Sequence, residues 1–373
     1  MRNKLRIAFL AIAAIFLLSC QLQQNKQKAN SGNLSADEET NSPTPKNIIF
    51  MIGDGMGTSH VFAALTAQKG KLEMARCKHI GFCKTQSANN YITDSAAGVS
   101  AFATGKKTNN GVLNISPQGD TLKTVLEIAE ENGLSTGLIA TSTIAHATPA
   151  GFVAHNINRN NYEEIALDYL KTEVDIFIGG GRDHFENRKD GQNLSEQLRS
   201  RGYDVVYSLK DVLSSNQNKI AGMLYKSDPP KMSEGRGQML EKSSMKAIEI
   251  LNKNDKGFFL MIEGSQIDWA GHEKDSEYLV SEAVDFDIVI GKVLDFAEQD
   301  GETLVVITAD HECGGYAIVG GNIESGEVVG DFCLGDHTAT MVPVFAFGPG
   351  AEQFMGIINN TDLFHNFIEL YGF

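Results

Sequence analysis

Acidic residues and histidines recur at short spacings in the second half of the chain. The segment that begins at Glu263 reads Glu-Gly-Ser-Gln-Ile-Asp-Trp-Ala-Gly-His. If it is helical, Asp268 and His272 lie four residues apart on one face, where both can reach one metal ion. Such a pair on its own is more often an exposed ion pair, but Asp310 and His311 form a second pair of the same types. Carboxylate and imidazole ligands together favour zinc over calcium or magnesium.

Ser95 is a candidate nucleophile because it opens a predicted helix. It stands in the run Thr93-Asp94-Ser95-Ala-Ala, and a serine at a helix N-terminus is usually only a cap. The backbone N–H groups and the helix dipole at that place also favour a phosphate group, and a metal ion can hold the serine alkoxide near neutral pH. No Gly-x-Ser-x-Gly sequence surrounds Ser95, which argues against acyl transfer by a catalytic triad.

The candidate ligands follow apolar runs that predict buried strands. These strands are predicted at residues 47–52, 136–140, 174–178, 258–262, 304–307 and 342–347. Helices are predicted between them at residues 121–132, 162–170, 237–252 and 276–299. The alternation predicts an α/β fold with a mostly parallel central sheet flanked by helices on both faces. Ligands of such sheets bind at the carboxyl ends of the strands, which is where Asp54, Glu263 and Asp310 are placed.

Two segments break the alternation and are predicted to be small insertions in a single domain. Residues 183–230 are polar and irregular, and residues 314–335 have the pattern of a β-hairpin with its turn at residues 320–322.

Three glycines at residues 179–181 lack the Lys and Ser/Thr of a phosphate-binding P-loop. We therefore predict a tight exit from a strand there.

The N-terminus has the pattern of an export signal. Three basic residues among the first six precede an apolar run that ends at Leu18. The run has about a dozen residues and a membrane-spanning helix needs ~20, so residues 1–20 are predicted to be a secretory signal. The serine before Cys20 resembles a bacterial lipoprotein cleavage box, which predicts a lipid on Cys20 and an anchored protein facing the periplasm or the cell exterior; ordinary signal cleavage is the alternative. Residues 21–45 are predicted to be a flexible tether, and residues 46–373 the catalytic domain.

The net charge of the chain is −15. An acidic surface argues against nucleic acid or anionic lipid as the main partner, and bound metal is the simplest source of the positive charge that phosphate chemistry needs. Besides Cys20, four cysteines would lie in an oxidising compartment. Two disulfides, 77 to 83 and 313 to 333, or four free buried thiols are both open for Cys77, Cys83, Cys313 and Cys333.

Seven motifs between residue 47 and the C-terminus resemble, in the same order, those of the alkaline phosphatase family. They are Gly-Asp54-Gly-Met-Gly, Thr-Asp94-Ser95-Ala-Ala-Gly, His146-Ala-Thr148-Pro-Ala-Gly, Asn-x-Asn-Arg159, Glu263-Gly-x-x-Ile-Asp268-x-x-x-His272, Thr-Ala-Asp310-His311 and Asp336-His337-Thr. The resemblance implies an alkaline phosphatase-like fold and metal-dependent hydrolysis of phosphate monoesters. It also implies a phosphoserine intermediate on Ser95 and release of inorganic phosphate and an alcohol.

The same resemblance implies two zinc ions, one magnesium ion and a homodimer. Asp268, His272 and His337 would hold the first zinc, Asp54, Asp310 and His311 the second, and Asp54, Thr148 and Glu263 the magnesium. Arg159 would clamp two oxygens of the phosphoryl group, a geometry that suits a guanidinium. Asp94 and Trp269 are implied to lie beside the substrate.

Two positions depart from the best-known bacterial pattern. His146 stands where some branches carry Asp and is expected to weaken magnesium selectivity at the third site. Trp269 stands where they carry Lys; its indole N–H can donate one hydrogen bond but supplies no positive charge toward bound phosphate.

Other functions that use the same metal core fit these motifs less well. A phosphodiesterase or a phosphonate hydrolase is one alternative, but Arg159 favours a dianionic monoester. A sulfatase would need Cys/Ser-x-Pro-x-Arg around its nucleophile, and the two alanines after Ser95 do not match it. A non-catalytic phosphate- or metal-binding lipoprotein would tolerate the loss of Ser95 or of one ligand, but every ligand is present.

Overall fold

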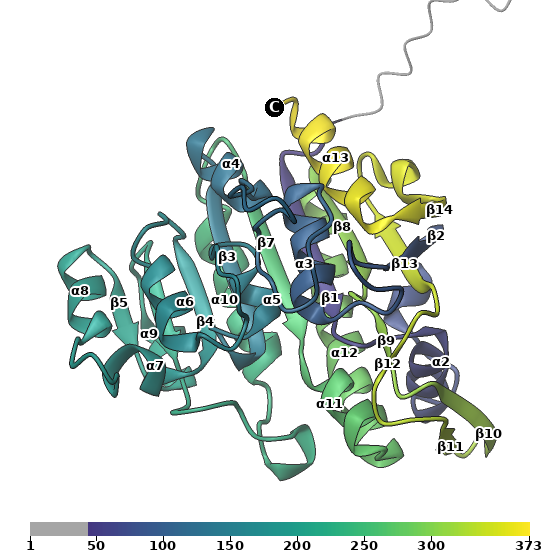
Figure 1. The fold of residues 1–373 in the computed structure, drawn as a ribbon. Coiled ribbons are helices and arrows are strands. Elements are labelled where there is room, and N and C mark those ends of the chain that lie inside the picture. The colour runs from purple at the N-terminus through teal and green to yellow at the C-terminus, as the bar shows by residue number, and fades with distance from the viewer. Residues whose placement is uncertain (1–43) are drawn as a thin grey trace, which may run out of the picture. The chain divides into compact units, whose positions relative to one another are not determined.

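The computed structural model describes residues 44–373, and they form one domain around a ten-stranded sheet (Figure 1). The predicted signal peptide, Cys20 and nearly all of the predicted tether lie outside the described residues. From one edge of the sheet to the other, the strands are β14 (Gly356–Asn359), β2 (His79–Lys84), β13 (Val342–Phe347), β8 (Thr303–Thr308), β1 (Asn47–Gly53), β7 (Phe258–Gly264), β3 (Ser135–Thr143), β4 (Ile176–Gly180), β6 (Ile220–Met223) and β5 (Asp204–Val206).

Every pairing in this sheet is parallel except those of β13, which runs antiparallel to β8 and β2. The described helices are α2 (Thr58–Ala67), α3 (Ser95–Thr104), α4 (Val125–Glu131), α5 (Ala147–Ala150), α6 (Tyr162–Asp168), α7 (Arg182–Glu186), α8 (Leu194–Ser200), α9 (Leu209–Ser214), α10 (Met239–Leu251), α11 (Gln266–Glu273), α12 (Ser276–Asp300) and α13 (Asn360–Tyr371). Short 3₁₀ turns are η1 (Glu73–Arg76), η2 (Met232–Glu234) and η3 (Ala351–Phe354).

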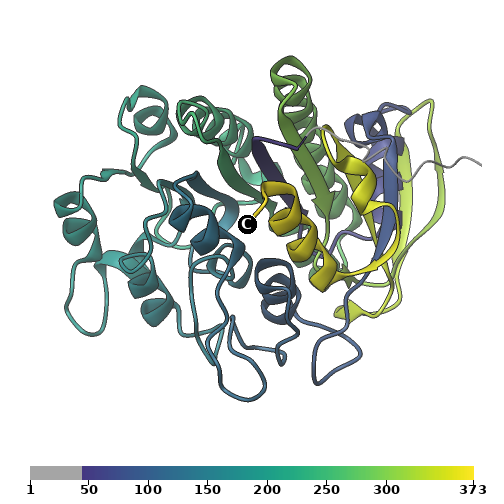
Figure 2. The same cartoon turned by 90° about the horizontal axis from the view of Figure 1, so that it is seen from above.

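Helices cover the sheet on both faces, with α10 and α12 on one side and α3, α4 and α13 on the other (Figure 2). The whole of β1 is therefore buried, which explains why Asn47–Gly53 reads as a continuous apolar run rather than an alternating one. The predicted fold class, a mostly parallel sheet flanked by helices, is confirmed.

The boundaries of the observed elements differ from the predicted ones by a few residues. The helix predicted from residue 121 begins at Val125, because Thr124 and Glu127 form a capping box there. The three glycines at residues 179–181 do form a tight exit: β4 ends at Gly180, and Gly181 has φ +93° before α7.

Parts of the sheet were missed from the sequence. Residues 183–230 do not form an irregular insertion outside the sheet, since β5 and β6 extend its far edge. The edge strand β14 and its neighbour β2 were also missed, because they are short and partly exposed and so lack a strong apolar run. The predicted hairpin is present as β10 (Tyr316–Asn322) and β11 (Glu327–Phe332), with its turn at residues 323–326 instead of 320–322.

The two predicted disulfides are wrong. All four described cysteines are free: Cys77, Cys83 and Cys313 are buried, and Cys333 is exposed. The alternative of four free thiols holds except that one of them is not buried. Within residues 44–373, no helix is both long and apolar enough to span a bilayer.

Candidate active site

The site forms where β7, β1 and β8 end side by side. Asp54 directly follows β1, Glu263 is the last but one residue of β7, and Asp310 comes two residues after β8; all three are fully buried. The backbone of Asp54 donates to the carbonyl of Gly264 (3.2 Å), and the backbone of Gly55 donates to Asp310 Oδ1 (3.2 Å). Parallel pairing of neighbouring strands thus brings the three carboxylates together.

The turn after β1 requires glycine at position 55. Gly55 has φ +71°, and a methyl group there would lie 2.8 Å from the Cα atom of Asp268. The close approach lets the Asp54 turn pack directly against α11, which carries the next set of ligands.

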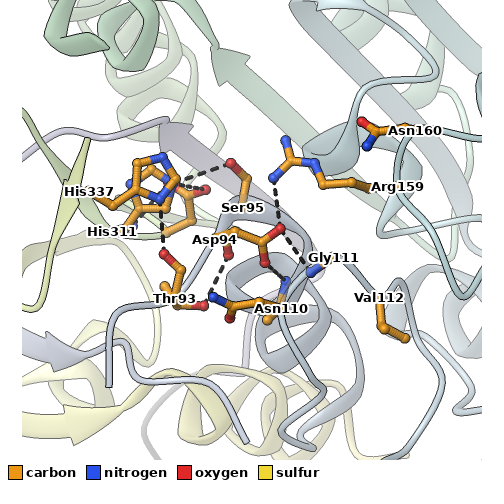
Figure 3. A network of polar contacts seen from close by, with 12 residues as sticks. Thr93, Asp94, Ser95, Asn110, Gly111, Val112, Arg159, Asn160, His311 and His337 are labelled. Carbon is orange, nitrogen blue, oxygen red and sulfur yellow. Dashed lines mark hydrogen bonds and ion pairs between the residues drawn. The ribbon is translucent and has the colours of Figure 1, made fainter. Parts of the chain in front are cut away.

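Ser95 is the first residue of α3, but it is not the helix cap. Asp94 is the cap: its Oδ1 accepts from the backbone N–H of Ala97 at 3.0 Å. The Ser95 hydroxyl is therefore free of the capping role and instead lies 3.2 Å from His311 Nε2 (Figure 3). A buried hydroxyl at a helix N-terminus is thus left available for chemistry.

Asp94 also orients Arg159. Its Oδ2 accepts from Arg159 Nη1 and from the backbone N–H of Gly111, both at 3.0 Å (Figure 3). Burial pushes the pKa of Asp94 up, but the Arg159 charge and the hydrogen bonds from Ala97 and Arg159 outweigh it and hold that pKa below its usual value. The second arm of the guanidinium, Nη2, lies 3.3 Å from His146 Nε2.

A first cluster of ligand types consists of Asp268 and His272 on α11 with His337 of β12 (His337–Thr338). The two Nε2 atoms are 3.1 Å apart, and each lies 3.3–3.4 Å from an oxygen of Asp268. The Nδ1 atoms face the carbonyls of Gly335 (3.0 Å) and Thr93 (2.9 Å). If both Nδ1 atoms donate to these carbonyls, two Nε2 lone pairs and a carboxylate meet at one point, an arrangement that a bound cation would stabilise.

A second cluster consists of Asp54, Asp310 and His311. His311 Nε2 lies 3.4 Å from Asp54 Oδ1 and 3.3 Å from Asp310 Oδ2. The His311 and His337 rings stack with centroids 3.5 Å apart, so the first two clusters are adjacent.

A third cluster consists of Asp54, Glu263 and His146, whose ligand atoms all lie within 4.8 Å of one another. His146 therefore lies among the ligand atoms and not only behind them. Thr148 of α5 is fully buried, and its hydroxyl has no hydrogen-bond partner among residues 44–373. The Trp269 ring packs edge-on against the His146 ring with centroids 6.0 Å apart, which places Trp269 on the same side of the site.

The charges in these clusters fit divalent cations. Both oxygens of Asp54 and one oxygen each of Glu263, Asp268 and Asp310 are buried without a hydrogen-bond partner in the described part of the chain. Burial, with repulsion from the neighbouring carboxylates, raises the pKa of Asp54 well above its usual range, and burial raises that of Glu263 to about 8. Bound cations would satisfy these oxygens and keep them ionised.

One residue of the site was not predicted as a ligand. The Cys313 thiol belongs to the first cluster, although from the sequence it was considered only for a disulfide. Its position two residues after His311 could have indicated that it is a ligand. However, Cys313 faces His337 only through a pair of two-residue strands, which is too short to predict from the sequence.

Comparison with known proteins agrees with this geometry. The family described as Alkaline phosphatase matches residues 45–331. Alkaline phosphatase 4 of Bacillus subtilis (strain 168) is 33% identical, over 97% of this chain and 95% of its own length. The solved alkaline phosphatase of the Antarctic bacterium TAB5 is 39% identical with a TM-score of 0.84, covering 88% of this chain and 98% of its own.

A variant of the TAB5 enzyme with a histidine replaced by aspartate has magnesium bound in its M3 site; it is 38% identical with a TM-score of 0.83, covering 88% of this chain and 99% of its own. The motifs, the clusters of buried ligand types and these likenesses agree. The chain belongs to the alkaline phosphatase family and is a metal-dependent enzyme that hydrolyses phosphate monoesters through a phosphoserine intermediate.

Proposed function

We propose that this phosphatase works with two zinc ions and one magnesium ion. The observation that carries the proposal is the convergence of unpartnered carboxylate and imidazole atoms beside the Ser95 hydroxyl. Asp268, His272 and His337 would hold the first zinc, Asp54, Asp310 and His311 the second, and Asp54, Glu263 and Thr148 the magnesium. When bound, the ions supply positive charge that favours the serine alkoxide and offsets charge on the phosphoryl and leaving oxygens.

The chain's own residues orient the substrate. Asp94 fixes the guanidinium of Arg159, which binds two oxygens of the phosphoryl group, while the N-terminal N–H groups of α3 attract the same charge. Ser95 Oγ then attacks phosphorus in line with the leaving oxygen. The phosphoserine ester forms as the bond between phosphorus and the leaving oxygen breaks, which releases the alcohol. Water hydrolyses the phosphoserine, which releases inorganic phosphate and restores Ser95.

Metal analysis combined with hydrolysis rates tests this assignment. We expect two zinc ions and one magnesium ion per chain, and faster hydrolysis of a phosphate monoester than of a matched diester, because Arg159 suits a dianion. A protein that prefers the diester would instead support the phosphodiesterase alternative.

The His146→Asp variant should depend more strongly on added magnesium. A carboxylate favours a hydrated hard cation more than imidazole does, and His146 lies within 4.8 Å of the Asp54 and Glu263 ligand atoms. The His-to-Asp variant of the TAB5 enzyme, with magnesium in its M3 site, supports this expectation. The measurement is a magnesium titration of activity, with His155→Asp, outside the clusters, as the matched control. An unchanged magnesium dependence would contradict the assignment.

The Trp269→Lys variant should bind product phosphate more tightly. The new ammonium group would approach bound phosphate from the His146 side, with a gain on the order of 1.5–3 kcal/mol before screening by water. If phosphate release limits turnover, the tighter binding of phosphate should also lower the maximal rate. Phosphate inhibition is measured for Trp269→Lys and for Trp269→Met, which has similar length and no charge. Equal inhibition in the two variants would mean that position 269 does not face the phosphate.

We also propose that the protein is an exported lipoprotein, anchored through Cys20 and facing the periplasm or the cell exterior. The support is the sequence alone: the basic start, the short apolar run and the serine before Cys20. The Cys20→Ser variant should release activity from the membrane fraction without changing turnover. Finding the wild-type protein already soluble after export would disprove the anchor.

The protein is further proposed to act on small-molecule monoesters as a homodimer, without specific binding to nucleic acid. The support is family membership for the dimer and the net charge of −15 for the lack of nucleic-acid binding. Light scattering of the purified protein gives its mass and tests the dimer directly.

A further inference from the structure

The Cys313 thiol lies inside the first cluster of ligand types. Its sulfur and the ligand atoms of Asp268, His272 and His337 all lie within 4.8 Å of one another. Cys313 is fully buried in β9 (Glu312–Cys313) and faces His337 across the antiparallel pair of β9 and β12 (Figure 1). The thiol therefore has the same neighbours as the three expected zinc ligands.

The surrounding backbone holds the sulfur in that place. The backbone N–H of Cys313 donates to the carbonyl of Gly55 at 3.0 Å, which ties β9 to the Asp54 turn. A methyl group at Gly271 of α11 would lie 2.8 Å from the sulfur, so only glycine there leaves room for the thiol. In the same cluster, Asp268 Oδ1 is buried and lacks a hydrogen-bond partner among residues 44–373.

We propose that Cys313 is a fourth protein ligand of the first metal position, engaged by thiophilic cations such as cadmium. Thiolate is a softer ligand than imidazole or carboxylate, and cadmium is a softer cation than zinc, so a thiolate in the cluster favours cadmium over zinc. On binding, the thiol proton passes to solvent and a sulfur–cadmium bond forms, with no change of oxidation state. The inference rests on the proposed metal role of Asp268, His272 and His337.

Engagement of Cys313 has a catalytic consequence. A catalytic zinc site keeps a coordination position open, with three protein ligands, whereas four protein ligands make a closed site. Cadmium bound by all four side chains would keep less of its coordination shell for the substrate than zinc bound by three. The cadmium-loaded enzyme is expected to be much less active than the zinc enzyme.

Ultraviolet absorption of the cadmium-loaded protein tests the proposal. The measurements use a Cys20→Ser, Cys333→Ser background, because the thiols of these two residues could bind cadmium elsewhere. We expect a sulfur-to-cadmium charge-transfer band that disappears in Cys313→Ser and persists in Cys77→Ser, whose buried thiol is the matched control. The preference for cadmium over zinc should fall by about tenfold or more in Cys313→Ser.

Two results would overturn the proposal: no such band in the background protein, or a band that survives in Cys313→Ser. The first measurement needs no substitution at Cys313, so it remains decisive if Cys313→Ser does not fold. A different result would contradict the proposed function, namely full activity without divalent cations. If the enzyme depends on zinc but shows no charge-transfer band with cadmium, only the role of Cys313 is contradicted.

Discussion

Replacing Ser95 with alanine is expected to lower kcat/KM for a phosphate monoester by at least about 10³-fold, equivalent to ~4 kcal/mol of transition-state stabilisation. The reason is that Ser95 Oγ is the proposed acceptor of the phosphoryl group: it is the first residue of α3, and its hydroxyl lies 3.2 Å from His311 Nε2. Steady-state hydrolysis gives the rate, and trapping of the phosphoenzyme at acidic pH shows whether the covalent intermediate is lost.

Ser100→Ala is the matched control for this experiment. Ser100 lies in the same helix and is equally buried, but its hydroxyl contacts the backbone of Val112 and Asn114 instead of the ligand clusters. The variant should lose some stability and keep its rate. A Ser95→Ala enzyme that retained wild-type turnover would show that the phosphoryl group is transferred elsewhere.

Removal of divalent cations is expected to abolish hydrolysis, with a loss comparable to that of Ser95→Ala. Without cations, the four buried carboxylates of the three adjacent clusters repel one another, and neither the serine alkoxide nor the leaving oxygen is stabilised. Activity is measured after dialysis against a chelator and again after addition of zinc, of magnesium, or of both.

The expected order of recovery is specific. Zinc with magnesium should restore the rate fully, and magnesium alone should not, because histidines contribute to the first two clusters. Ser95→Ala should take up the same zinc while staying inactive, which separates metal binding from catalysis. Full activity in a thoroughly metal-free preparation would rule out the mechanism.

Much of the site could be predicted from the sequence because its residues follow buried parallel strands. Asp54, Glu263 and Asp310 come at the ends of apolar runs, and the carboxyl ends of parallel strands meet at one edge of the sheet. The spacing of Asp268 and His272 predicted a shared helix face, and α11 provides it. These are local patterns that a single sequence contains.

Other parts of the arrangement depend on contacts that a local pattern does not encode. His337 reaches Asp268 only because β12 pairs with β9 across a hairpin excursion, and both strands have two residues. The pairing of Asp94 with Arg159 joins loops 65 residues apart. From the sequence alone, His337 was a candidate ligand by its residue type and loop position. Its partners in the first cluster and the role of Arg159 came through family resemblance, whereas the place of Cys313 was missed.

The ligands of the three clusters come from points between Asp54 and His337, spread over most of the described chain. A chain that has not yet formed its central sheet therefore has no metal site, and cations bind the folded state only. Such linkage adds RT ln(1 + [L]/Kd) to the free energy of unfolding, about 2.7 kcal/mol for one site at a hundredfold excess over Kd. The melting temperature of this protein is consequently a measure of its metal occupancy, and heat resistance follows the cation content of its surroundings.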